Sequence, residues 1–339
     1  MQTTETIYEK LKKVREKNGE VEFQAEVTQQ ALETYIAEEL EHVASNLELP
    51  GFRKGKVPAH IIRERTDEMA ILEGAAEHAL RDAVREIVAN ENLSIVGSPR
   101  LTITKIAPKN PIEFKVMLAL YPEIKLPDYK KIGAEIAGRK DDIEVTEKDI
   151  DDAILRIRTM TGIEALTDEA VAKFGPFKTL DEFKVKLKEN ILKDKEIQAK
   201  ETRREEIMQE IVKKSKVQIP ELLLDEEWYG FEEQRNTQLE AAKLSLEDYV
   251  KQNNKTKEEL EKQERSLIEE RIKTSMVFRE IKKAENITAP EKEIQTNIAH
   301  LKLRYPDRDE AWLRDTAEAL IIQEKIFTLL GLPIGNLLG

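Results

Sequence analysis

The sequence predicts an α+β amino-terminal domain followed by an elongated, mostly α-helical domain with projecting arms. Alternating apolar residues within the first 120 residues indicate strands, and apolar residues at helical spacing indicate helices in most of the remaining chain. The composition agrees with this. Charged residues make up 36% of the chain and aromatic residues 5%, with 13 glycines and 12 prolines among 339 residues. Long amphipathic helices with solvated faces explain such a mixture better than turn-rich β-sheets do.

The first domain contains both periodicities. Three segments alternate between apolar and polar residues and predict the strands of one sheet, namely residues 21–27, 101–104 and 114–120. Between them, apolar residues at helical spacing predict helices over residues 32–47 and 71–88. Residues 7–14 fit either a helix or a strand, so their structure stays open.

Two prolines mark the end of this domain. Pro122 and Pro127 lie in the segment YPEIKLPD, where they remove backbone donors and favour extended geometry, which is typical of an inter-domain connection. We therefore predict a first domain of residues 1–121, a linker of residues 122–145 and a helical domain of residues 146–339. Within the linker, Ile132, Ala134 and Ile136 form a short alternating segment.

Helix-start signals recur along the second domain. Threonines whose hydroxyls can accept a hydrogen bond from the first turn are Thr146, Thr179, Thr256 and Thr288. The longest helical pattern runs from residue 180 to about residue 216 without glycine or proline, so we expect a helix that projects. Further helices are predicted over residues 147–160, from Pro220 onward, after Thr256, and over residues 294–303 and 312–330.

Catalytic and cofactor motifs are missing from the sequence. The absence of cysteine excludes thiolate catalysis, sulfur-based zinc sites and disulfides, and it fits a reducing compartment. The histidines show no metal-ligand spacing; they are His42, His60, His78 and His300. We expect no catalytic residue, no metal and no cofactor.

The chain also lacks a nucleotide-binding loop and membrane segments. The only Gly-Lys pair, Gly55-Lys56, is followed by Val57 instead of serine or threonine, so it does not match the phosphate-binding loop. The amino terminus has no targeting pattern, and the longest apolar runs are too short to span a bilayer. We therefore expect a soluble, cytoplasmic protein with no membrane partner.

One basic segment departs from the acidic character of the chain. With 55 Lys+Arg and 67 Asp+Glu the net charge is −12. Residues 51–65 contain five basic side chains and one acidic, a local charge of +4, so the remainder carries −16. Lysine and arginine can bind phosphate oxygens, and Phe52 at the tip can enter an apolar crevice or stack on a base. A helix-connecting loop with a solvated charge cluster is the alternative that the charge alone leaves open.

The segment GFRKGKVP, residues 51–58, resembles the ribosome-docking signature of the trigger factor family of bacterial chaperones. Three further stretches resemble parts of that family: EFKVMLALYPE, KFGPFKTLDEFK and VQIPELLLDEE. The resemblance implies an ATP-independent chaperone that holds nascent polypeptides at the peptide tunnel exit of the ribosome, beside a ribosomal protein and rRNA. The ribosome-binding residues that it implies are Gly51, Phe52, Arg53, Lys54, Gly55, Lys56 and Pro58.

The resemblance is interrupted where the family usually carries an FKBP-like prolyl isomerase domain, after the first helix of the helical domain. Here the six residues 161–166 connect the helix over residues 147–160 to the next segment. Six residues cannot form a β-barrel with a binding pocket. We therefore expect the isomerase domain to be absent near residues 161–166 and the protein not to be an enzyme.

Four residues of the helical domain are candidate contacts for unfolded polypeptide: Trp228, Phe231, Met276 and Phe278. Methionine adapts to varied partners, and aromatic rings offer a large contact area. Two other functions remain as alternatives, a helical adaptor anchored to RNA by the basic loop and a prolyl isomerase. A homodimer away from the ribosome is also expected, because a second copy can cover an exposed binding surface.

Overall fold

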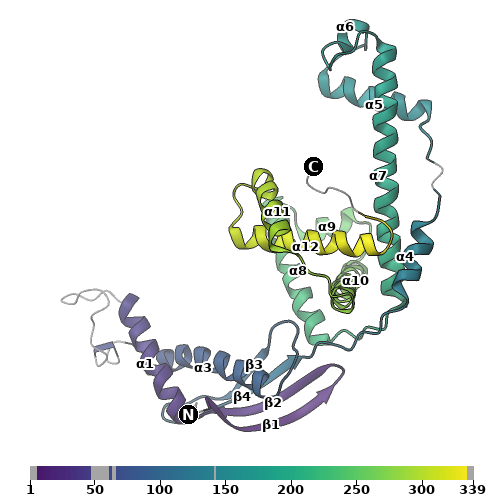
Figure 1. The fold of residues 1–339 in the computed structure, drawn as a ribbon. Helices are drawn as coiled ribbons and strands as arrows, with labels where there is room; N and C mark the ends of the chain where they lie inside the picture. Colours follow the sequence, from purple (N-terminus) through teal and green to yellow (C-terminus); the bar gives the residue numbers. More distant parts are fainter. Residues whose placement is uncertain (1–5, 47–60, 63–65, 141–142, 334–339) are drawn as a thin grey trace. The chain divides into compact units, whose positions relative to one another are not determined.

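The computed structural model describes residues 6–46, 61–62, 66–140 and 143–333 of the chain. The chain divides into two compact units (Figure 1), each assembled from two stretches of sequence. Unit 1 comprises Met1–Glu123 and Val217–Lys273, and unit 2 comprises Ile124–Lys216 and Thr274–Gly339. This division differs from the contiguous domains 1–121 and 146–339 that the sequence suggested, because residues 217–273 belong with the amino-terminal sheet.

Unit 1 is built around one antiparallel sheet with the strand order β1-β2-β4-β3. Its strands are β1 (Tyr8–Lys17), β2 (Glu20–Val27), β3 (Arg100–Lys105) and β4 (Ile112–Ala119). The three strands predicted from alternation are confirmed, and the open segment at residues 7–14 is a strand. The turn from β1 to β2 consists of Asn18 and Gly19, both at positive φ (57° and 77°). This is the backbone conformation that a two-residue hairpin requires.

One face of the sheet forms the core of unit 1. Alternate residues of β2 and β4 are buried under helix α3 (Glu68–Asn90), beside α1 (Gln29–Asn46). The face of α3 that packs there is rich in alanine: Ala75, Ala76, Ala79 and Ala83 are all completely buried. Small side chains let the helix approach the sheet closely, so the larger residues Phe23 and Phe114 fill the space between them. Both predicted helices of this domain are thereby confirmed.

Helix α8 (Glu221–Ala241) joins unit 1 through bonds to the sheet and its loops. The backbone amide of Leu222 donates to the buried carboxylate of Glu20, 2.7 Å away. The carboxylate of Glu226 accepts from the amide of Ser98 at 2.7 Å. Such charge-assisted bonds, of which the one to Glu20 is buried, tie distant segments together. They explain why residues 217–273, which also include α9 (Leu246–Gln252) and the start of α10 (Lys257–Ala284), group with the sheet.

Unit 2 is helical in its described residues. Besides the end of α10 it contains α4 (Tyr129–Ala137), α5 (Glu147–Thr161), α6 (Asp168–Val171), α7 (Leu180–Lys214), α11 (Glu291–Arg304) and α12 (Glu310–Leu329). The expectation of an alternating segment around residues 132–136 is wrong, because α4 lies there and packs on α7. Ile132 and Ile136 are buried four residues apart, which is one helical turn. The predicted linker, residues 122–145, therefore contains a packed helix.

Three of the four threonines predicted to start helices do so. Thr146 and Thr179 are the N-caps of α5 and α7, and Thr256 forms a reciprocal pair of bonds with Glu259 at the start of α10. The prediction for Thr288 is wrong. Pro290 occupies the N-cap position of α11, without a side-chain hydrogen bond.

Candidate functional site

The basic segment singled out by the sequence, residues 51–58, lies outside the described residues. The structure on either side of it is well packed. Ile62 is 1% exposed and packs with Leu40 and Ala44 of α1 and Ile71 of α3. One apolar cluster therefore holds together the described residues that precede and follow the segment.

Two of the four candidate polypeptide contacts lie on α8 in unit 1. Trp228 is 7% exposed and stacks on the half-buried Phe231, with ring centroids 6.0 Å apart. The guanidinium of Arg265, from α10, lies 4.9 Å from the Trp228 ring centroid. Trp228 is therefore part of the packing between α8 and α10, while its neighbour Tyr229 is 73% exposed.

The other two candidates lie on α10 in unit 2. Met276 is 4% exposed, and the half-buried Phe278 meets Phe327 of α12 edge-on at 5.9 Å between centroids. Edge-to-face contacts of this kind stabilise packed helices. Sequence spacing places all four candidates on apolar helix faces, and in the structure these faces are turned toward neighbouring helices.

A buried ion pair lies next to Trp228. The Nη1 atom of Arg235 on α8 is 2.5 Å from Oε2 of Glu264 on α10, and these residues are 8% and 5% exposed. The rings of Trp228 and Phe231 each lie 5.9 Å from the guanidinium carbon. Within the described part of the chain, Arg235 Nε and Glu264 Oε1 have no hydrogen-bond partner. Arg235 Nη2 also bonds to the half-buried carboxylate of Glu232 at 3.4 Å. Arg235 is the cation that compensates the buried Glu264, in a site largely screened from water.

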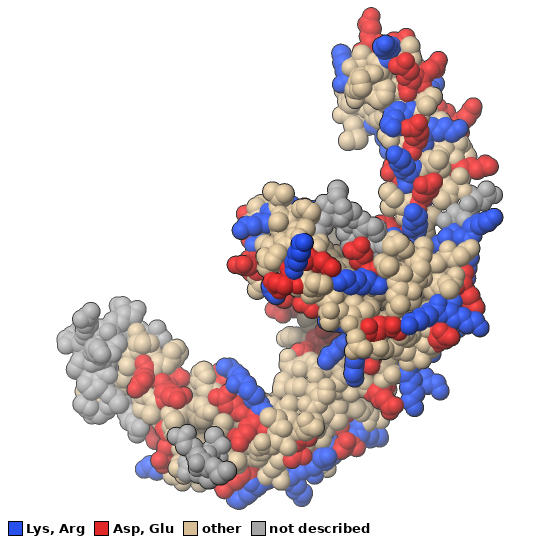
Figure 2. Space-filling view, in the orientation of Figure 1, with Lys and Arg blue, Asp and Glu red and all other residues tan. Residues whose placement is uncertain are grey.

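Exposed apolar side chains that the sequence analysis missed gather on the helical arm formed by α5, α6 and the first part of α7. They are Leu155 (58% exposed), Met160 (87%), Val185 (61%) and Ile197 (55%). Among its described residues α5 has none that is buried. Along α7 lysine and arginine alternate with acidic side chains in Figure 2. Apolar groups set among charges of both signs can contact unfolded chains while the surface stays hydrated.

Within the arm, Phe183 of α7 packs against Phe174 and Phe177 of the loop after α6, whereas polar contacts link α5 to α7. Asp149 at the start of α5 accepts a hydrogen bond from Nζ of Lys195 on α7 at 2.6 Å, and further bonds from the amide and hydroxyl of Thr146, both at 2.8 Å. The bond from Lys195, followed by those from Thr146, lowers the pKa of Asp149 to about 2. Because few apolar groups are buried between α5 and α7, this carboxylate is a main link between them.

Acidification is expected to loosen the α5–α7 contact. A carboxylate whose pKa is lowered in the folded state stabilises that state above its unfolded pKa, and the contribution is lost as the pH falls from about 4 toward about 2. Protection of the α5 amides against hydrogen exchange, taken relative to the intrinsic exchange rate at each pH, should therefore fall over this range. In Asp149→Asn this protection should already be lower at pH 7 and should change less on acidification. Asp152→Asn, on the same helix, is the control; identical acid profiles for all three proteins would contradict the assignment.

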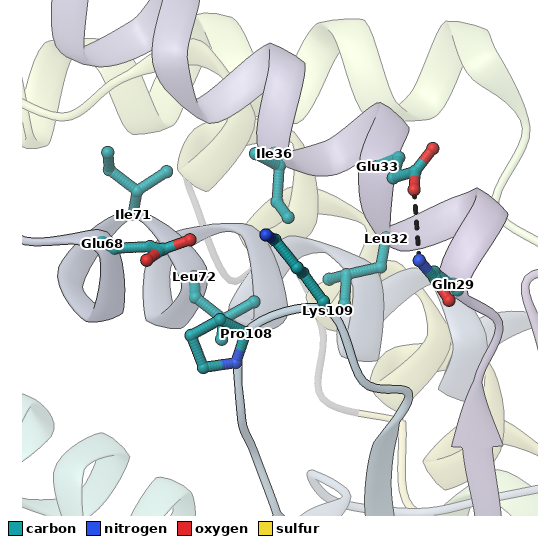
Figure 3. Close-up of a pocket in the computed structure, with 9 residues that line it drawn as sticks. All are labelled: Gln29, Leu32, Glu33, Ile36, Glu68, Ile71, Leu72, Pro108 and Lys109. Atoms are coloured by element: carbon teal, nitrogen blue, oxygen red, sulfur yellow. Dashed lines mark hydrogen bonds between the residues drawn. The ribbon is translucent and has the colours of Figure 1, made fainter. Parts of the chain in front are cut away.

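One cavity of unit 1 lies between α1, α3 and the loop after β3. Its volume is about 550 Å³. Leu32, Ile36, Ile71 and Leu72 provide an apolar lining, and in Figure 3 the side chain of Lys109 extends across the opening toward Glu68. On the α1 side Gln29 donates to Glu33 at 3.4 Å. The cavity offers apolar contacts and no constellation of groups for acid–base chemistry.

The described residues contain neither a metal-binding cluster nor a membrane-spanning helix. No cluster of three or more histidine, aspartate or glutamate side chains in this part of the chain has an arrangement that could hold a metal ion. None of the described helices combines the length and the apolar character needed to cross a bilayer.

Comparison with known proteins gives two matches to one family. Residues 10–157 match the model for bacterial trigger factor protein, and residues 179–329 match the model for its C-terminus. The unmatched stretch between them, residues 158–178, covers the end of α5, α6 and the loop before α7. This is the place where the sequence suggested that a domain is missing.

Individual relatives match over very different lengths. The trigger factor of Rhodococcus erythropolis is 34% identical over 139 residues, which cover 41% of this chain but only 29% of the relative. That of Nostoc sp. is 24% identical over 422 residues, covering 91% of this chain and 87% of the relative. The latter alignment is longer than this chain, so the relative carries residues that this chain lacks.

A solved structure supports the fold. It is of a trigger factor chaperone described for promiscuous substrate recognition in folding and assembly, and it covers 95% of this chain and 99% of its own with a TM-score of 0.54. At 14% identity this likeness concerns the fold alone. The two family matches together cover both units, including the amino-terminal sheet and the long helices. This chain therefore belongs to the trigger factor family.

Proposed function

We propose that this protein is a ribosome-associated, ATP-independent molecular chaperone that holds nascent or unfolded polypeptides. The observation that carries the proposal is the pair of family matches, which together account for most of the chain. The exposed apolar side chains of the α5–α7 arm support it, because they can make many weak contacts with unfolded segments. Holding of this kind needs no nucleotide, in keeping with the lack of a phosphate-binding loop in the sequence.

Ribosome binding is assigned to the basic segment. Phe52, Arg53 and Lys54 would contact the ribosomal protein and rRNA at the tunnel exit, while Gly51, Gly55, Lys56 and Pro58 would shape and support the turn. Cations neutralise phosphate, and the net charge of −12 disfavours indiscriminate adhesion elsewhere on the RNA surface.

Changing Phe52, Arg53 and Lys54 together to alanine is expected to abolish co-sedimentation with ribosomes. Wild-type binding should also weaken as salt rises, because phosphate contacts release counterions. The matched control is Lys12→Ala/Lys17→Ala, which also removes two positive charges, but from the exposed strand β1. This variant should pellet with ribosomes as the wild type does. Undiminished pelleting of the loop variant would refute the assignment.

Holding of polypeptide is tested with a panel of unrelated unfolded proteins, followed by light scattering. A chaperone suppresses the aggregation of most of them, whereas an adaptor binds one partner and leaves the panel unaffected. Contacts of Trp228, Phe231, Met276 and Phe278 with the client, and a homodimer away from the ribosome, remain part of the proposal.

The protein is proposed to lack prolyl isomerase activity. Only 18 residues, 162–179, separate α5 from α7, and a closed barrel with a pocket needs far more chain than this. A refolding assay limited by proline isomerisation tests for this activity. Acceleration of refolding by the purified protein would overturn this part of the proposal.

A further inference from the structure

Strand β3 forms a bare edge of the sheet in unit 1. Among the described residues, the order β1-β2-β4-β3 leaves β3 with a single neighbouring strand, and all six residues of β3 are exposed. An edge strand carries unpaired backbone N–H and C=O groups, which are a template for pairing with another chain. Only some residues of such a strand direct these groups outward.

The hydrogen bonds just beyond β3 identify these residues. On the β3 side of β4, the amide of Val96 donates to Ala119 at 2.9 Å, and the amide of Tyr121 donates to Ser94 at 2.7 Å. Backbone groups in an antiparallel ladder alternate in direction from residue to residue. The β4 register against β2 has no irregularity. The odd-numbered residues of β4 therefore direct their backbone groups toward β3.

The cross-strand partners of β3 show which of its residues direct their backbone groups away from β4. Thr102 lies opposite the odd-numbered Lys115, so its backbone groups bond to β4. Leu101 and Ile103 lie opposite even-numbered residues, so their N–H and C=O groups are directed away from the sheet. Two outward-facing residues, one on each side of Thr102, are thus available for a further strand.

The same two residues also extend the apolar core to the edge. Leu101 lies opposite Val116 and Ile103 opposite Phe114, both of which are completely buried on the core face. Leu101 and Ile103 are nevertheless 39% and 42% exposed. Backbone groups and apolar side chains are therefore offered together, as strand addition requires.

The two edges of the sheet differ in charge. Strand β1 carries lysine or arginine at half of its ten positions, and charges of this kind discourage edge pairing. Both edge strands pair irregularly with their neighbours, β1 at two points and β3 at one, between Ile103 and Lys105. In β3 the only charges are at the ends, where Arg100 and Lys105 face Asp225 and Glu113.

A cavity of about 570 Å³ opens at the Arg100 end of β3. Its wall includes Ser98 and Pro99, which lead into the strand, and Trp228 and Tyr229 of α8. Its size is in the range of pockets that accept small molecules or large side chains. A chain running along β3 would reach this cavity with one of its side chains.

We propose that β3 binds an extended segment of unfolded polypeptide as a fifth strand of the sheet. The segment pairs its backbone with Leu101 and Ile103, lays its apolar side chains beside theirs, and places one aromatic or large aliphatic side chain in the cavity that Trp228 and Tyr229 line. This inference rests on the proposed chaperone function and specifies the client as an extended segment with alternating apolar residues.

Amide exchange measured by NMR on the full chain tests the pairing. The probe is reduced, carboxymethylated α-lactalbumin, which stays unfolded. At saturation the exchange of the Leu101 and Ile103 amides should slow by about tenfold or more, because each gains a hydrogen bond, whereas that of Thr102 should change little. Binding of the probe without protection of Leu101 and Ile103 overturns the inference and leaves the chaperone function standing. A wild-type protein that does not bind unfolded proteins at all overturns both.

A pair of variants at one position provides an independent test. Ile103→Pro removes the outward N–H without removing a bond to β4, since proline is tolerated at such edge positions. Ile103→Thr keeps the N–H and the β-branched shape. The dissociation constant for the probe should rise about tenfold in Ile103→Pro and clearly less in Ile103→Thr. Equal binding by Ile103→Pro and wild type, with unchanged circular dichroism, refutes strand addition.

Discussion

Replacing Arg235 with leucine is expected to lower the free energy of unfolding of unit 1 by about 3–5 kcal/mol. The substitution leaves the Glu264 carboxylate, 5% exposed, without its cation. An uncompensated charge in a site of low dielectric is strongly unfavourable. Urea unfolding measures the change, followed by fluorescence in a Trp312→Phe background, because Trp228 is then the only tryptophan and adjoins the site.

Two further variants show whether burial is the cause. Changing both Arg235 and Glu264 to leucine removes both charges and should recover most of the lost stability. Arg271→Leu breaks an exposed pair with Glu227, 2.6 Å apart, between the same two helices. It should cost less than about 1 kcal/mol. Similar losses in Arg235→Leu and Arg271→Leu would show that the buried pair has no special weight.

Replacing Phe114 with alanine should destabilise unit 1 by about 3–5 kcal/mol. Phe114 is completely buried on the core face of β4, under the alanine-rich face of α3. Close packing there prevents the helix from filling the vacated space, so a cavity adds to the lost burial. Urea unfolding in the same Trp312→Phe background measures the change.

The control lies on the same strand. Met117 points to the opposite face of β4 and is half-buried, so Met117→Ala should cost less than about 1.5 kcal/mol. If both substitutions had the same effect, the core would not be confined to the face that packs against α3.

Elements with strong periodicity could be predicted, and ambiguous ones could not. Alternation in β2 and β4 reflects one buried and one solvated face, so it identified both strands. In α4, Ile132 and Ile136 fit a period of two as well as one helical turn. The choice between them came from packing on α7, which adjacent residues do not encode.

For the candidate polypeptide contacts, too, the sequence does not show which apolar residues are packed and which are exposed. Apolar residues on α8 mark a helix, but Trp228 and Tyr229 are adjacent, and only one can face α10. In the structure Trp228 is the packed residue and Tyr229 is the exposed one. Helical spacing alone does not assign these roles. The exposed Leu155 and Met160 were missed because the sequence does not show which helix faces lack a neighbour.

The sequence by itself determined the fold class, most strands and helices, and the resemblance to the trigger factor family. These depend on periodicity and short motifs, which are properties of contiguous residues. Only the tertiary structure decided that residues 217–273 pack with the amino-terminal sheet, that Arg235 meets Glu264, and that β3 is an edge strand among the described residues. Each of these depends on which distant segments come together to exclude water and to pair backbone groups, and burial of that kind exists only in the folded chain.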